Sequence, residues 1–162
     1  MKVGTGLYSL ISGFQSAYFP RFMTLWSQSD RRGFREALQW TLWWSSLVMA
    51  VISMLLLLFA EEFLSLWLGP DQPPEAAIFV RCAAVHFLID AMSGPLTTAV
   101  LATGRVLRYQ ILVSLIASSG FFLVWLLLAN GLPAWTSFAA VAATNFLALC
   151  YRVQYVRKNI LA

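Results

Sequence analysis

Charged side chains are scarce in this sequence. Asp, Glu, Lys and Arg make up 11% of the 162 residues, whereas hydrophobic residues make up 60%. Soluble domains carry roughly 25% charged residues, so the composition excludes an ordinary soluble domain. The net charge of +4 does not indicate nucleic-acid binding, because the basic residues lie at the ends of apolar stretches, where they set orientation and meet anionic lipid. We therefore expect membrane lipid, and no nucleic acid, as a partner.

The sequence also lacks the residue combinations that enzymes and metal sites need. It contains one histidine and two cysteines. Cys82 and Cys150 are expected at opposite membrane depths, which prevents a disulfide, and no spacing is typical of a zinc site. There is no glycine-rich phosphate loop, nucleophile motif or pair of carboxylates within an apolar stretch. We predict that the protein is not an enzyme and uses no cofactor or metal.

A recognisable signal peptide is missing too. Lys2 supplies a positive start, but small and polar residues interrupt the apolar core that such a peptide needs. These residues are Gly4, Thr5, Gly6, Ser9 and Ser12. We therefore expect the chain to begin inside a membrane helix, which is unusual for a complete protein.

Five long apolar stretches fill most of the chain. They run over roughly residues 3–26, 38–60, 76–102, 109–129 and 133–151. About 20 mainly apolar residues cross a bilayer, and backbone polar groups in lipid must be bonded within the segment, which favours helices. The sequence thus predicts an all-α, polytopic membrane helix bundle of about five transmembrane helices in a single domain, residues 1–162.

The gaps between these stretches alternate in charge. Basic gaps follow the first, third and fifth stretches, and an acidic gap follows the second; the basic residues are Arg31, Arg32, Arg35, Arg105, Arg108, Arg152, Arg157 and Lys158, and the acidic ones Glu61, Glu62, Asp71 and Glu75. Cytoplasmic loops collect Lys and Arg. We expect a multi-pass membrane protein that starts outside and has a cytoplasmic C-terminus.

Aromatic residues near the stretch ends are expected to lie in the membrane interface, which amphipathic rings prefer. At the inner boundary these are Trp40, Trp43, Trp44, Tyr109, Tyr151 and Tyr155, and at the outer boundary Trp67 and Trp135. A short interfacial helix is expected over residues 63–68.

Two stretches carry small residues at every fourth position. In the fifth these are Thr136, Ala140, Thr144 and Ala148, and in the first Thr5, Ser9, Gly13 and Ala17. Such strips let helix backbones approach closely. They indicate either helix packing or the wall of a polar cavity. The cavity alternative is favoured more for the first stretch, where Gln15 adds polarity.

The third stretch holds most of the candidate functional residues. Asp90 lies about midway along it, where an acidic group usually faces a partner or a wet cavity. His86 lies on the same helical face, so the two could share a proton or bind a polar group. Arg81 is either an interface anchor that snorkels outward or a substrate contact. Asp90 could instead make a buried hydrogen bond to a neighbouring helix. We predict that Arg81, His86, Asp90 and Gln15 face a cavity.

Pro95 follows Gly94 on the same stretch. Proline cannot donate a hydrogen bond to the carbonyl four residues earlier, that of Ala91, so a helix kink is expected there. Broken helices beside a charge at the bilayer midplane are common in transporters.

Three short motifs, in this order, resemble those of polysaccharide-unit flippases, the O-antigen and exopolysaccharide exporters of the multidrug/oligosaccharidyl-lipid/polysaccharide exporter superfamily. The motifs are Phe19-Pro20-Arg21-Phe22 with Ser29-Asp30 and Phe34, then Leu66-Trp67-Leu68-Gly69, then Val100-Leu101-Ala102-Thr103-Gly104-Arg105. One departure is Ser29-Asp30, where Gly-Asp is typical.

This resemblance implies one lobe of a two-lobed flippase, the last five of about a dozen helices, with an amino-terminal lobe as its missing partner. It also implies alternating access, a location in the bacterial inner membrane and an undecaprenyl-diphosphate-linked oligosaccharide as cargo. Two alternatives remain open: a fragment of a cation-coupled multidrug exporter in which Asp90 is the coupling site, and a small structural membrane subunit.

Overall fold

The computed structural model describes residues 13, 17–69, 73 and 75–161, and the regular elements among them are all helices. The elements are α2 (Arg31–Leu58), α3 (Ala60–Leu68), α4 (Ala76–Ala102), α5 (Leu107–Ala129) and α6 (Trp135–Asn159). Four of them, α2, α4, α5 and α6, are long and apolar enough to cross a membrane. The predicted all-α membrane bundle is therefore confirmed. Most of the predicted first span, residues 3–26, lies outside the described residues, although residues 17–27 are helical.

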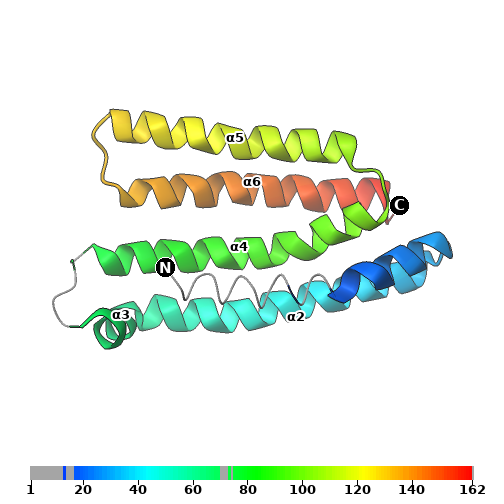
Figure 1. Ribbon diagram of the computed structural model, residues 1–162, viewed down its shortest axis with the longest axis horizontal. Coiled ribbons are helices and arrows are strands. Elements are labelled where there is room, and N and C mark those ends of the chain that lie inside the picture. Colours follow the sequence, from blue (N-terminus) through cyan, green and yellow to red (C-terminus); the bar gives the residue numbers. More distant parts are fainter. Residues whose placement is uncertain (1–12, 14–16, 70–72, 74, 162) are drawn as a thin grey trace.

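The four long helices form one layer in the order α2, α4, α6, α5 (Figure 1). Long helices that follow one another along the chain run in opposite directions, so α4 and α6, which lie side by side, run in the same direction. The ends that carry most of the basic residues therefore meet on one side of the layer, and we call this side the basic end. The opposite side holds α3 and the start of α4, with Glu61, Glu62 and Glu75, and we call it the acidic end. The alternating charges of the sequence are thus segregated in space.

The helix α2 begins at Arg31, seven residues before the start expected at residue 38. The side chain of Asp30 caps it, since its Oδ1 accepts a hydrogen bond from the Gly33 amide at 2.9 Å. Ser29 precedes the cap with a φ of +56°. That left-handed conformation suits glycine better, which explains physically why a Gly-Asp pair is typical of this motif.

Other boundaries differ by small amounts from those expected. α5 begins at Leu107 rather than 109, and α6 runs from Trp135 to Asn159 rather than from 133 to 151. Arg157 and Lys158 lie in the last turn of α6, where positive charge is favourable. Hydropathy marks where a helix leaves the apolar layer, and α6 continues past that point.

The interface between α2 and α4 uses small and polar residues. Along α2 the buried positions recur every fourth residue: Thr41, Ser45, Met49 and Ser53. They face α4, whose buried alanines include Ala84 and Ala91, and Ser53 Oγ donates to the Ala84 carbonyl at 2.9 Å. Small residues and hydroxyl bonds of this kind hold membrane helices together. The apolar character of residues 38–60 did not predict this stripe.

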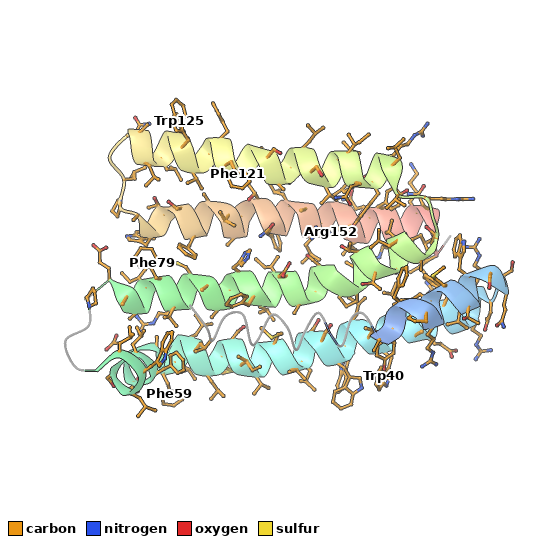
Figure 2. All side chains as sticks on the ribbon, in the orientation of Figure 1. Trp40, Phe59, Phe79, Phe121, Trp125 and Arg152 are labelled. Atoms are coloured by element: carbon orange, nitrogen blue, oxygen red, sulfur yellow. The ribbon has the colours of Figure 1, made fainter. Side chains whose placement is uncertain are left out.

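The aromatic residues divide into two groups. Trp40, Trp43 and Trp44 are exposed on α2, as expected of an interface belt, and Trp40 and Trp125 point away from the layer (Figure 2). Tyr109, in contrast, is fully buried in the core at the basic end. Tyr109 thus lies near the end of its helix, as expected, but its ring packs within the bundle and its hydroxyl has polar partners there.

Candidate functional site

Arg81 lies near the acidic end of α4, and its side chain reaches toward α2 and α3. Its Nη2 is 3.2 Å from Glu61 Oε1, and its Nε donates to the Leu57 carbonyl at 3.3 Å. Both side chains of the ion pair remain partly exposed. The guanidinium is therefore occupied by a carboxylate and a helix-terminal carbonyl, as in an anchor at the membrane boundary.

His86 pairs across the helix interface instead of along its own helix. Its Nδ1 lies 3.0 Å from Nδ2 of Asn145 on α6. An amide nitrogen can only donate, so His86 Nδ1 accepts and its ring proton lies on Nε2. The expected His86–Asp90 hydrogen bond does not occur, and Asn145 was not recognised from the sequence.

Asp90 is half-buried about midway along α4. Among the described residues the ion pairs are Arg32–Glu36 and Arg81–Glu61, and no side-chain hydrogen bond involves the Asp90 carboxylate. An acidic group at this depth costs about 2.5–3.5 kcal/mol on insertion scales. Its charge is thus carried without compensation from the described part of the chain.

Asp90 belongs to a stripe of polar residues on α4, at intervals of four, three and four positions: His86, Asp90, Ser93 and Thr97. This spacing keeps side chains on one side of a helix. Ser93 is 2% exposed, and its hydroxyl has no hydrogen-bond partner among the described residues. Because a buried hydroxyl without a partner is costly, this position suits a bound water molecule.

At the basic end the stripe meets polar groups of α5 and α6. The Tyr109 hydroxyl lies 2.9 Å from Thr97 Oγ1 and accepts a hydrogen bond from Arg152 Nε at 3.2 Å. Figure 2 shows Arg152 at the end of α6 beside the end of α4. We call His86, Asp90, Ser93, Thr97, Asn145, Arg152 and Tyr109 the polar seam. It joins α4 to α6 through the middle of the layer.

Pro95 interrupts the hydrogen bonds of α4 just beside the polar seam. α4 continues through it as a helix, and its last turns bend away from the line of its first part (Figure 1). The Ala91 carbonyl, which cannot bond to Pro95, lies 3.2 Å from Ser45 Oγ on α2. The same hydroxyl is 2.8 Å from the Thr41 carbonyl, so its proton serves one or the other. The free Ala91 carbonyl therefore shares the Ser45 hydroxyl donor with carbonyls of α2.

Replacing Ser45 with alanine is expected to destabilise the bundle by about 1 kcal/mol, because the Ala91 carbonyl loses its donor within the membrane. Titration with a denaturing detergent, followed by circular dichroism, measures this change. In a Pro95→Ala background, where the backbone amide of residue 95 bonds to Ala91, Ser45→Ala should cost almost nothing. An equal cost in both backgrounds would contradict the assignment, and Ser46→Ala serves as the matched control.

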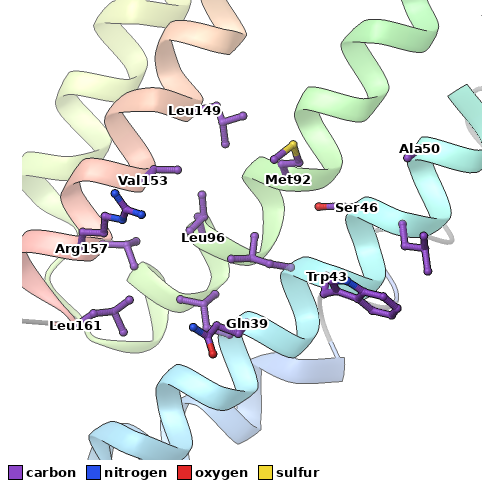
Figure 3. Close-up of a pocket in the computed structure, with 14 residues that line it drawn as sticks. Gln39, Trp43, Ser46, Ala50, Met92, Leu96, Leu149, Val153, Arg157 and Leu161 are labelled. Atoms are coloured by element: carbon purple, nitrogen blue, oxygen red, sulfur yellow. The ribbon is translucent and has the colours of Figure 1, made fainter. Parts of the chain in front are cut away.

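A groove lined by α2, α4 and α6 does not contain the predicted site residues. Met92 lines this groove (Figure 3), and Asp90 is about 200° from Met92 around the helix, so it lies on the opposite face of the layer. Arg81 and His86 are also absent from the lining. Gln15 lies outside the described residues. The structure thus joins His86 and Asp90 to the polar seam and separates Arg81 from it.

Comparison with known proteins gives one family match. A family model described as MatE matches residues 1–126, which extend from the start of the chain through most of α5. No curated protein and no solved structure matches the chain.

Proposed function

Because this chain belongs to the MatE family of membrane transporters, we propose that it forms part of an alternating-access exporter in which Asp90 couples transport to a cation. Asp90 carries the proposal, because a half-buried carboxylate without an ion-pair partner among the described residues can take up and release a proton or another monovalent cation. Ser93 supplies a neighbouring hydroxyl that has no hydrogen-bond partner in the described part of the chain.

The shape of the layer supports a change between two conformations. The part of α4 beyond Pro95 shares the core at the basic end with Leu38 of α2, Tyr109 of α5 and the last residues of α6, and the part before it packs on α2 through Ala84 and Ala91. Hinges of this kind let one part of a helix move relative to the other. Asp90 lies on α4 between the acidic end and the hinge at Pro95. Binding of a cation there would favour one of the two conformations.

For the cargo we propose a lipid-linked oligosaccharide, namely an undecaprenyl-diphosphate-linked unit for polysaccharide or lipopolysaccharide biosynthesis. The support is the order of the three sequence motifs that resemble polysaccharide-unit flippases. A drug is the alternative cargo, and the contact of Arg81 with Glu61 weakens the expectation that Arg81 meets a diphosphate.

Deleting the gene tests the cargo. If the protein is a flippase, lipid-linked oligosaccharide should accumulate on the cytoplasmic leaflet of the deletion strain, while its drug susceptibility stays unchanged. Extraction of radiolabelled glycolipid, with and without periplasmic enzymes that digest exposed sugars, measures the first quantity, and growth in the presence of cationic dyes measures the second. Unchanged glycolipid together with increased dye sensitivity would support the drug exporter and exclude the flippase.

We also propose that the basic end is cytoplasmic and that the second lobe of the transporter packs on this layer. In the layer, α4 contacts α2 and α6, and α2 and α5 lie at the edges. Each long helix therefore keeps surface on both faces of the layer for other helices or lipid.

Cysteine labelling tests this orientation. In a chain whose native Cys82 and Cys150 are replaced by serine, Glu75→Cys should react with an impermeant thiol reagent in intact cells, and Arg105→Cys should react only after the cells are opened. Both positions are exposed at opposite ends of α4. The reverse pattern would overturn the proposed orientation.

A further inference from the structure

We propose that an anionic phospholipid binds in the groove between α2 and α6, with one acyl chain along the floor formed by α4 and its phosphate beside Arg157. The groove has a volume of about 640 Å³, within the range of ligand sites. Figure 3 shows side chains from all three helices converging on it. This inference is independent of the proposed cargo.

The walls of the groove are apolar along most of its length. Leu42, Leu47 and Ala50 of α2 face Leu149 and Val153 of α6 across it, and Met92 and Leu96 of α4 form the floor. Such a surface, open on one side, matches a flexible hydrocarbon chain better than a polar solute.

The polar residues of the groove gather near the basic end. Arg157, Gln39 and Leu161 line one end, whereas Met92 and Ala50 line the other (Figure 3). The Arg157 side chain is exposed and has no ion-pair partner among the described residues. A guanidinium binds phosphate oxygens through paired N–H donors. The positive Arg157 side chain therefore lies where the negative phosphate of the lipid headgroup would be.

The length of the groove matches one leaflet. From Gln39 to Ala50, α2 rises about 16 Å at about 1.5 Å per residue, and half of the hydrocarbon core of a bilayer is about 15 Å thick. A phospholipid whose phosphate meets Arg157 would therefore place the end of its acyl chain near Met92 and Ala50. This agreement of charge and length favours a lipid of the leaflet at the basic end over a second protein helix.

The experiment uses the full chain, purified in a neutral detergent and mixed with equal amounts of phosphatidylglycerol and phosphatidylcholine. Native mass spectrometry then counts retained lipids. We expect one retained phosphatidylglycerol, and Arg157→Gln should reduce its retention about fivefold, since each basic group near the surface contributes about 1 kcal/mol. Ala50→Trp, which fills the exposed apolar end, should reduce retention of both lipids.

Two variants serve as matched controls. Lys158→Gln removes a neighbouring charge that does not line the groove, and Val51→Trp adds an indole at an exposed position beside it. Both should retain phosphatidylglycerol as the unmodified chain does. If Arg157→Gln and Ala50→Trp each retained as much phosphatidylglycerol as the unmodified chain, the proposal would be overturned. Displacement of phosphatidylglycerol by an equal amount of a polyprenyl phosphate would overturn the assignment to a phospholipid.

Discussion

Asp90→Asn is expected to abolish cation-driven export while leaving the fold intact. Asparagine keeps the size and hydrogen-bonding capacity of the side chain but cannot bind and release a proton. One elementary charge that crosses about 100 mV releases about 2.3 kcal/mol. Losing one coupled cation should thus lower the sustainable cargo gradient about 50-fold, since each 1.36 kcal/mol is a factor of ten. Transport into inverted membrane vesicles with an imposed potential measures this ratio.

Stability distinguishes this functional role from a structural one. Burying a charge is costlier than burying an amide, so Asp90→Asn should preserve or raise resistance to detergent denaturation. Asp90→Glu should retain part of the coupling, and Glu36→Gln, at an exposed acid outside the polar seam, should retain all of it. Normal gradient-driven export by Asp90→Asn would exclude Asp90 as the coupling residue.

Gly120→Leu is expected to detach α5 from α6. A Cβ at Gly120 would lie 2.7 Å from Thr144 Oγ1 and 3.3 Å from two other atoms of that side chain. Among the long helices α5 packs mainly on α6, with Tyr109 also meeting Thr97 of α4, and its buried residues are Tyr109, Val113 and Gly120. Overpacking of a close contact costs about 1–3 kcal/mol. A leucine side chain is larger than the single Cβ atom considered above. We expect the free energy of unfolding, measured by titration with a denaturing detergent, to fall by an amount at the upper end of this range.

A second substitution tests whether the contact causes the loss. Gly120→Ala should destabilise the bundle less than Gly120→Leu does. Adding Thr144→Ala to the Gly120→Ala chain should restore most of the lost stability, because it removes Oγ1. That hydroxyl bonds only to carbonyls of α6 among the described residues, so its removal leaves α5 its other contacts. Ser118→Leu, at an exposed position of α5, is the matched control. Equal losses at positions 118 and 120 would contradict the proposed contact.

Much of the fold follows from the sequence because a bilayer constrains local structure so strongly. The third apolar stretch and α4 have the same bounds, 76–102, since lipid leaves a helix as the way to satisfy the backbone. The small residues of the last stretch also lie where their spacing indicates, with Ala140, Thr144 and Ala148 buried in helix contacts. This favours packing over a cavity wall for that strip.

The candidate site was only partly predictable. His86 and Asp90 were found because polar residues are rare in an apolar helix, but Asn145 and Arg152 lie on a helix distant in sequence. Ser45 gave no signal, because its role depends on a carbonyl that Pro95 leaves free on another helix. A periodic search for polar residues along residues 38–60 would have pointed to Ser45 and Ser53.

Hydropathy and charge were enough to predict the helices, their alternating directions along the chain and the separation of charge between the two ends, because both act locally in a membrane. The partners of the polar side chains became known only from the packing of the helices. Arg81 contacts Glu61 and not a site in the seam, His86 bonds to Asn145 and not to Asp90, and Tyr109 is buried beside Arg152. The order of helices in the layer sets these contacts, and that order depends on side-chain shapes across interfaces rather than on the pattern within any one helix.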